Sequence, residues 1–421
     1  MSPCMGHDQK SQLWFQPPDK LLRIVRRNWR GVAAICLFLL LGASNAGSAT
    51  GAQPSVLPFV ARSIPPLRLP AIIALGEASH GGQPMLFARN RLIRELAAEG
   101  GVSWVALETG YAEALLLDRF VRGGPGTPSE VAAKGFTSGF GSMAGNVALL
   151  EDLRTINLRR PAGSRIGIVG VDLSLGGPLG SAPTMAPVEC ALDGVRDPAL
   201  RESLRANFSK AVIPGLTQAD VTEQAKTAFR ELSRRLVSSV DHGAPEHARH
   251  CALIVTQSAA VLDTLPTLPA NHSFPPDAWR SVNARDEAMA ANALAVLAQA
   301  HGSSIVLFAH TSHILNAAMQ GGRWSGQSHP PHSMGEVLHR SLGSRYVAIV
   351  QIEPVTPPPS DAPPDLLQLL HPTCAEPCMV SPNELQLHQV RIGINGDDQE
   401  LINPMTAASF YLIVPKSFQP D

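Results

Sequence analysis

The chain has 421 residues, of which 44% are hydrophobic and 16% are charged, and its formal net charge is −1. Extended disorder requires low hydrophobicity and high net charge, so the composition excludes a largely disordered chain. A nucleic-acid-binding protein usually carries a large basic excess, so no nucleic-acid partner is expected. The length suits one large α/β domain with an insertion, or two domains.

The first 46 residues predict an export signal. Four arginines between positions 23 and 30 precede the apolar stretch Gly31–Gly42, and small residues follow up to Ala46. This order is typical of a secretory signal peptide. We expect cleavage after Ala46, with Ala49 and Ala52 as alternatives, and a periplasmic or secreted protein. An uncleaved anchor is the rival hypothesis, but twelve apolar residues are fewer than the ~20 that span a bilayer. We expect no stable membrane insertion after leader removal.

Loss of this leader would change both the charge and the cysteine count. The segment holds six Lys or Arg, two Asp and two Cys, so a net charge of −5 and four cysteines would remain. An even number of cysteines in an exported protein favours disulfides. We predict the pairs Cys190–Cys251 and Cys374–Cys378, with free buried thiols as the alternative.

Six short apolar runs predict the buried strands of a parallel sheet, because each is five or six residues long and is bounded by turn signals. Helical patterns over Met85–Glu99 and Ala112–Val121 follow the first two runs. Strand–helix–strand order predicts an α/β fold, with a parallel β-sheet flanked by helices. The runs are Ala71–Leu75, Val102–Leu107, Ile166–Val171, Ile305–Ala309, Val347–Ile352 and Phe410–Val414.

Residues 190–300 contain no strand-like run and are rich in Ala, Leu, Arg and Glu at helical spacing. Helices are predicted there at Thr222–Val240, His247–Leu265 and Arg280–Ala300. We therefore expect a helical insertion, or lid, over one edge of the sheet. The predicted organisation is a signal peptide (1–46), a first part of the α/β core (60–189), the helical insertion (190–300) and a second part of the core (301–421).

Five of the predicted strands run into polar, mostly ionisable residues. Ligands bind at the carboxyl edge of parallel sheets, so a group of such residues at one edge predicts a shared functional site. The five residues are Glu77, Glu108, Asp172, His310 and Glu353.

The densest motif, Gly76–Gly81, places His80 in a glycine-flanked turn. Because the ordinary pKa of histidine lies near neutrality, His80 is the predicted general base. Glu108 or Glu77 is expected to accept the other ring N–H of His80. His310 and His313 share one face if the turn after the strand is helical.

Three further hypotheses concern the chemistry of the predicted sites: a serine nucleophile and two metal sites. Ser79 is a candidate nucleophile, but its surroundings do not match G-x-S-x-G. A zinc site of His80, His310 and His313 with Glu77 or Glu108 competes with general-base chemistry. No cofactor is expected, although a divalent metal is an open alternative. A second, weaker metal candidate comprises His242, His247 and His250, near Cys251.

The ordered motifs of this chain resemble those of the erythromycin esterase family. They run from about Ile72 to the C-terminus and are weakest in the insertion. They comprise Ala74–Gly81, Arg89, Leu92–Arg94, Val105–Ala114, Leu117–Asp118, Val121–Gly123, Gly170–Asp172, Arg285–Asp286, Met289–Ala290, Asn292, Ala309–His313, Met334–Gly335 and Tyr346. Thr311–Ser312 and Tyr111 depart from the family pattern, where Asn and Trp are more usual.

The resemblance implies an α/β fold and the hydrolysis of a macrolactone-type ester by activated water. It assigns the base to His80, the two motif glutamates to Glu77 and Glu108, and the paired histidines to His310 and His313, which would orient the substrate or stabilise the oxyanion. Arg89, Arg285, Asp172 and Tyr111 would bind substrate. The expected partner is a small-molecule ester, and the oligomeric state is left open.

Two other functions stay open at this point. One is a periplasmic metal- or haem-binding protein on the same scaffold. The other is an enzyme that removes acyl groups from an envelope polysaccharide. An exported location is unusual for an antibiotic-resistance esterase, which would meet its antibiotic in the cytoplasm.

Overall fold

The computed structural model of the protein describes residues 56–67, 69–176, 182–211, 222–266, 275–353, 363–370, 374–382, 388–394 and 398–419. All of them belong to one compact unit, Ala52–Asp421. The predicted signal peptide lies outside the described residues. Within the described residues, no helix has the length and apolarity needed to cross a membrane.

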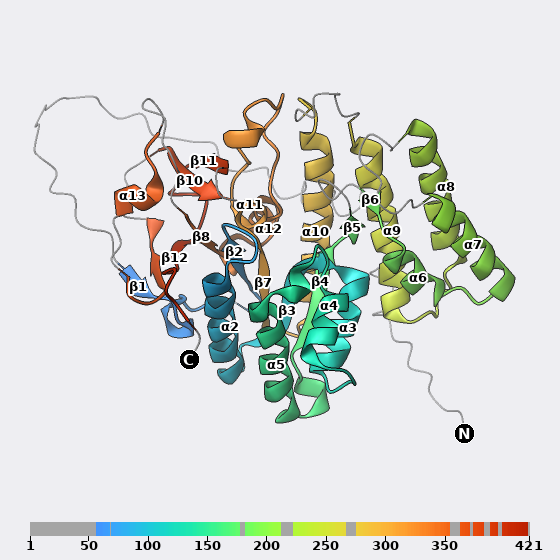
Figure 1. The fold of residues 1–421 in the computed structure, drawn as a ribbon, viewed down its shortest axis with the longest axis horizontal. Coiled ribbons are helices and arrows are strands. Elements are labelled where there is room, and N and C mark those ends of the chain that lie inside the picture. Colours follow the sequence, from blue (N-terminus) through green and yellow to red (C-terminus); the bar gives the residue numbers. More distant parts are fainter. Residues whose placement is uncertain are drawn as a thin grey trace, which may run out of the picture. The chain divides into compact units, whose positions relative to one another are not determined.

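The core is an eight-stranded sheet with the strand order β1-β9-β12-β8-β2-β7-β3-β4 (Figure 1). The six strands from β12 to β4 pair in parallel, and β9 and β1 extend one edge in antiparallel pairing. The predicted α/β fold is therefore confirmed. The strands are β1 (Val56–Pro58), β2 (Ile72–Glu77), β3 (Val102–Gly110), β4 (Gly167–Asp172), β7 (Ser304–His310), β8 (Tyr346–Gln351), β9 (Cys378–Val380) and β12 (Phe410–Ile413). Two short hairpin-like pairs lie outside this sheet, β5 (Leu175–Gly176) with β6 (Ala182–Pro183) and β10 (Val390–Ile394) with β11 (Asp398–Ile402).

Helices cover both faces of the sheet. One face packs against α2 (Gln83–Ala98), α3 (Tyr111–Val121), α4 (Pro128–Gly135) and α5 (Ala144–Leu158). The other face packs against α10 (Trp279–Gln299), α11 (Thr311–Ile314), α12 (Met334–Leu342) and α13 (Leu366–Leu370). Because helices pack on both faces of the sheet, the parallel strands are buried on both sides and consist mainly of apolar residues.

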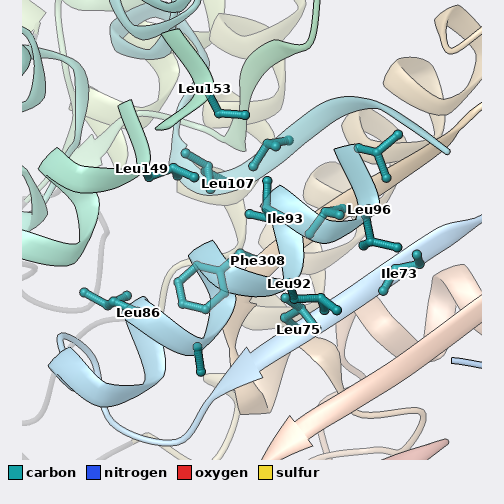
Figure 2. Close-up of a cluster of buried hydrophobic side chains, with 14 of the residues drawn as sticks. Ile73, Leu75, Leu86, Leu92, Ile93, Leu96, Leu107, Leu149, Leu153 and Phe308 are labelled. Carbon is teal, nitrogen blue, oxygen red and sulfur yellow. The ribbon is translucent and has the colours of Figure 1, made fainter. Parts of the chain in front are cut away.

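Strand β2 shows how the alternation of side chains builds the two layers. Ile73 and Leu75 point to the layer that contains Leu92 of α2, where Figure 2 shows their side chains in one cluster. Ile72 and Ala74 point to the opposite layer. Because side chains alternate along a strand, this central strand contributes to both apolar layers. Its ionisable residue, Glu77, lies at the carboxyl end of the strand.

The helices between β6 and β7 form a region with its own apolar core. This core is built from α6 (Ala186–Leu192), α7 (Pro198–Ala211), α8 (Glu223–Ser239) and α9 (Glu246–Thr264). A disulfide between Cys190 and Cys251 joins α6 to α9. Cys374 pairs with Cys378, so both predicted disulfides are present. Helix α10 falls within the predicted insertion, yet it buries Met289, Ala293 and Leu297 against the sheet.

The first test concerns the layer between the sheet and α2. Replacing the fully buried Leu92 by alanine should lower the free energy of unfolding by about 2–5 kcal/mol, because the change removes apolar contacts and leaves a cavity. Leu158→Ala is the matched control, since that side chain is 63% exposed. Denaturant unfolding of the two variants measures the difference, and equal losses would contradict the described core.

Candidate active site

His80 lies in the turn that follows β2, and its ring is fixed by Glu77. The Nδ1 atom of His80 lies 2.9 Å from Oε1 of Glu77, while the backbone N–H of Gly81 donates to Oε2 of the same carboxylate at 3.1 Å. A carboxylate only accepts hydrogen bonds, so Nδ1 carries the proton and Nε2 keeps its lone pair when the ring is neutral. Of the two glutamates that the sequence offered as partners of His80, the structure places Glu77 in contact.

Burial by itself would lower the pKa of His80. The hydrogen bond to Glu77 and the negative charges of Glu108 and Glu77 outweigh that effect, so the pKa is raised above the ordinary value of 6.5. A carboxylate partner thus makes the ring a stronger base. His80 is accordingly poised to exchange a proton at near-neutral pH.

A close approach between β2 and α11 brings His310 beside His80. A Cβ atom at Gly76 would lie 2.9 Å from Cα of Thr311, so only glycine fits there. The ring centroids of His80 and His310 are 4.8 Å apart as a result. Glu77 and His310 are also register partners at the ends of the adjacent strands β2 and β7.

Both ring nitrogens of His310 are already hydrogen-bonded. Nε2 lies 2.9 Å from the carbonyl oxygen of Ala78, and Nδ1 accepts the backbone N–H of Ser312 at 3.2 Å. Burial, followed by the charge of His80, lowers the pKa of His310 to about 3. His310 is therefore a neutral residue that positions the His80 turn.

His313 has the opposite character, because it lies between two carboxylates. Nδ1 is 2.8 Å from Oδ1 of Asp286, and Nε2 is 3.4 Å from Oε1 of Glu108. Burial would lower the pKa of His313, but the charges of Asp286 and Glu108 raise it to about 10. His313 is thus a partly buried cation at neutral pH.

Arg285 is the second cation of the site, and its side chain is partly buried. Its Nη2 atom lies 2.6 Å from Oδ2 of Asp172 and 3.3 Å from Oε1 of Glu108. Burial would raise the pKa of Glu108, but His313 and Arg285 hold it well below its ordinary value. Glu108 is therefore a permanent anion, and its Oε2 also accepts the backbone N–H of His310 at 2.8 Å.

A cavity of about 220 Å³ opens onto these groups at the carboxyl edge of the sheet. His80, Glu108, Arg285 and His313 line its charged side. Apolar residues of α9 and α10 and the segment after α11 line the rest, including Val261, Leu265, Val282, Met319 and Trp324. The helical region thus covers the sheet edge from which the ionisable residues project.

Arg89, Asp172 and Tyr111, three of the four predicted substrate-binding residues, do not line this cavity. Arg89 is fully buried, donates to Asn90 and Asn146, and packs 4.5 Å from the ring centroid of Phe308. Burial lowers its pKa to about 10, so it remains a cation at neutral pH. Tyr111 instead packs on His250, with ring centroids 4.1 Å apart.

The structure also gives Ser79 and Asp286 roles that the sequence did not predict. The hydroxyl of Ser79 donates to Oε2 of Glu353 at 2.8 Å, which gives it a structural partner. Asp286, which the sequence did not single out as a site residue, is fully buried and accepts hydrogen bonds from His313 and the backbone of Met334. Its place in the Arg285–Asp286 motif was the signal that could have marked it.

In the part of the chain that the structure describes, no three His, Cys, Asp or Glu side chains are grouped so as to hold a metal ion. This statement covers both histidine groups of the sequence. Cys251, the neighbour of the second group, is in a disulfide. The competing metal sites stay hypotheses.

Comparison with known proteins places this site in a family. The sequence pattern of the family described as erythromycin esterase matches residues 97–351, which is more than half of the chain. The chain belongs to the erythromycin esterase family. The match includes Glu108, Asp172, Arg285, His310 and His313, whereas Glu77 and His80 lie before it. Membership of the erythromycin esterase family supports hydrolase or esterase activity and a small-molecule substrate.

Three solved structures share the fold. A protein from Bacillus cereus is 20% identical, with a TM-score of 0.60, and the alignment covers 82% of this chain and 88% of that one. A succinoglycan biosynthesis protein is 16% identical, with a TM-score of 0.63 and coverage of 82% and 87%. A mutant of erythromycin esterase EreC in its open conformation is 18% identical, with a TM-score of 0.59 and coverage of 83% and 90%.

The three histidines of the site should titrate in distinct ranges. By imidazole NMR, His313 should keep its extra proton until the pH approaches about 10, and His310 should stay neutral down to about 3. His80 should lose its proton above 6.5. Asp286→Asn should lower the pKa of His313, because it removes one of the two charges that stabilise the cation. Titration of His313 near 6.5 in the unmodified protein would contradict the described network.

Proposed function

We propose that the protein is an exported carboxylic-ester hydrolase in which His80 activates a water molecule. The observation that carries this proposal is His80 in the cavity wall, held by Glu77, together with two partly buried cations, Arg285 and His313, that line the same cavity. A base with a free ring nitrogen and a fixed cationic environment are the two elements that ester hydrolysis requires.

The proposed reaction begins when Nε2 of neutral His80 removes a proton from water. The resulting hydroxide attacks the ester carbonyl carbon, and the negative charge moves to the carbonyl oxygen. Collapse of this intermediate breaks the bond to the alcohol oxygen, which takes the proton from His80. The products are one carboxylic acid and one alcohol. Because only the neutral ring can act as base, the rate should rise with pH through the pKa of His80.

His313 and Arg285 would stabilise the oxyanion electrostatically. Both line the cavity, and both are held by carboxylates rather than by solvent, so little reorganisation is needed when negative charge develops. Glu77 would keep the His80 ring in the reactive tautomer and stabilise the imidazolium that forms. These roles give His80, Glu77, His313 and Arg285 a task in one reaction.

The cavity volume bears on the substrate. Sites for drug-sized ligands usually measure about 300–1,000 Å³, and this cavity of about 220 Å³ is smaller. A small acyl ester fits the described state, whereas a macrolactone would require the helices above the site to move apart. We propose a macrolactone-type ester as the substrate, with an acyl group on a saccharide as the second candidate. The likeness to a succinoglycan biosynthesis protein motivates that second candidate.

Substitution of His80 tests the proposed base. His80→Ala should lower kcat/KM by about 10²–10⁴-fold, the usual contribution of a general base. Ser79→Ala should keep most of the activity, because its hydroxyl bonds Glu353 rather than a catalytic group. Exposed His339→Ala is the matched control. Mass spectrometry would follow addition of one water to erythromycin, small acyl esters and an acetylated saccharide, with and without a chelator.

The outcomes of this experiment separate the candidate functions. Product formation by His80→Ala near the unmodified rate would contradict the proposed base, and loss of activity only in Ser79→Ala would favour an acyl-enzyme. Activity that disappears with chelator would favour a metal. No product from any ester, with metal or haem bound to the purified protein, would favour a binding protein.

Export is the part of the proposal that rests on residues 1–46. Protein recovered from the periplasm of a bacterial host should begin at Gly47, which N-terminal sequencing can establish. A variant without the apolar stretch Gly31–Gly42 is the control and should stay in the cytoplasm with its N-terminus intact. Recovery of the unmodified chain only in the cytoplasm, with Met1 retained, would contradict export.

A further inference from the structure

Strand β2 ends between its two neighbours in the sheet, β8 and β7. Its register with β8 stops at Gly76, and its register with β7 stops at Glu77. Ala78 follows the last residue of the strand and is fully buried. Buried backbone groups in native proteins are almost always paired. The N–H and C=O groups of Ala78 therefore need hydrogen-bond partners beyond the end of the backbone ladder.

Side chains at the ends of the two neighbouring strands supply these partners. Oε1 of Gln351, the last residue of β8, accepts the backbone N–H of Ala78 at 3.1 Å. Nε2 of His310, the last residue of β7, donates to the C=O of Ala78 at 2.9 Å. The two bonds hold the peptide groups on either side of the Cα atom of Ala78. Because peptide groups are planar, this restricts both backbone torsions of that residue.

Gln351 is itself fixed from two directions. Its backbone C=O accepts the hydroxyl of Thr311 at 3.2 Å, and the residue is a register partner of Leu412 in β12. Gln351 is also buried. Groups supported from the strands of a fold are held more precisely than groups supported from loops. The Gln351 amide is thus well placed to fix the turn that follows β2.

The torsions of Ala78 determine how Glu77 meets His80. These two residues are three positions apart, and the 2.9 Å contact between Oε1 of Glu77 and Nδ1 of His80 closes across Ala78 and Ser79. A change in the torsions of Ala78 would therefore move the His80 ring relative to the carboxylate that fixes its tautomer. The hydrogen bond from Ala78 to Gln351 controls the geometry of the base at one remove.

A second contact joins the same turn to the segment after β8. The hydroxyl of Ser79 donates to Oε2 of Glu353 at 2.8 Å, and both residues are partly exposed. Water can replace either partner of that bond, whereas it cannot reach the N–H of a residue with no exposed surface. Loss of the Gln351 acceptor should consequently disturb the turn far more than loss of the Ser79 hydroxyl.

We propose that Gln351 is a positioning residue, which holds His80 in its reactive place through the backbone of Ala78. This role depends on the proposed function, because it presupposes that His80 is the base. Gln351 does not line the cavity, so it acts on the base and not on the substrate. A displacement of a reacting group by about 1 Å can lower a rate by about a hundredfold.

The test replaces Gln351 by two residues of similar length. Methionine lacks the amide oxygen, whereas glutamate keeps an oxygen that accepts the N–H of Ala78. With the ester that the unmodified protein hydrolyses best, Gln351→Met should lower kcat by about ten- to a hundredfold and change KM by less than about twofold. Gln351→Glu should recover most of the lost kcat. Ser79→Ala is the matched control and should keep most of the activity.

NMR gives a readout that needs no turnover. In Gln351→Met the pKa of His80 should fall toward 6.5, because a loosened turn weakens the bond to Glu77 that raises it. The pH–rate profile should shift to lower pH with it, and the amide proton of Ala78 should exchange faster. Gln351→Glu should not lower the pKa of His80. The titratable groups that face His80, all unchanged in Gln351→Met, are Glu77, Glu108, His310 and His313.

The outcomes separate positioning from support of the fold. Unchanged kcat and unchanged pKa of His80 in Gln351→Met would overturn the proposal, and so would equal loss of kcat in both variants with the pKa of His80 unmoved. Gln351→Asn, whose amide is one methylene too short to reach Ala78, replaces the methionine variant if that chain does not fold. If the unmodified protein hydrolyses no ester, the proposed function fails, and the pKa of His80 and the exchange of the Ala78 amide decide alone.

Discussion

The carboxylate of Glu108 is the group around which the candidate active site is assembled. It accepts the backbone N–H of His310 and lies against both Arg285 and His313. Three elements distant in sequence, β3, β7 and α10, therefore meet at one anion. Because a buried charge without partners is strongly unfavourable, these elements are held in a single arrangement wherever Glu108 is ionised.

The same principle gives the three site histidines three different chemistries. His310 is neutral because burial, followed by the charge of His80, lowers its pKa to about 3. His313 is held as a cation because Asp286 and Glu108 flank it. His80 has a pKa raised above its ordinary value, since Glu77 and Glu108 outweigh its partial burial. Identical side chains can thus provide a spacer, a fixed charge and a base at one sheet edge.

The helical region connects this chemistry to the rest of the molecule. Helix α10 belongs to the sheet by its packing, yet it also carries Arg285 and Asp286 into the site. Helix α9 closes the same cavity with Val261, and Leu265 adds to this wall directly after the helix ends.

The sequence by itself indicated the chain order of the six parallel strands and the carboxyl edge as the place of the ionisable residues. These features follow from local signals, namely apolar runs and turn residues. The two cysteine pairs were predicted with free thiols as the alternative, and the structure contains both disulfides. Only the tertiary structure decided that Glu77 rather than Glu108 holds His80, that Asp286 supports His313, and that Arg89 and Tyr111 lie away from the cavity. These contacts depend on which side chains of β2, β3, β7 and α10 come together in space. The periodicity of the sequence does not indicate which of them do. The small strands β1 and β9 were likewise not predicted, because three-residue segments carry too little pattern to be distinguished from loops.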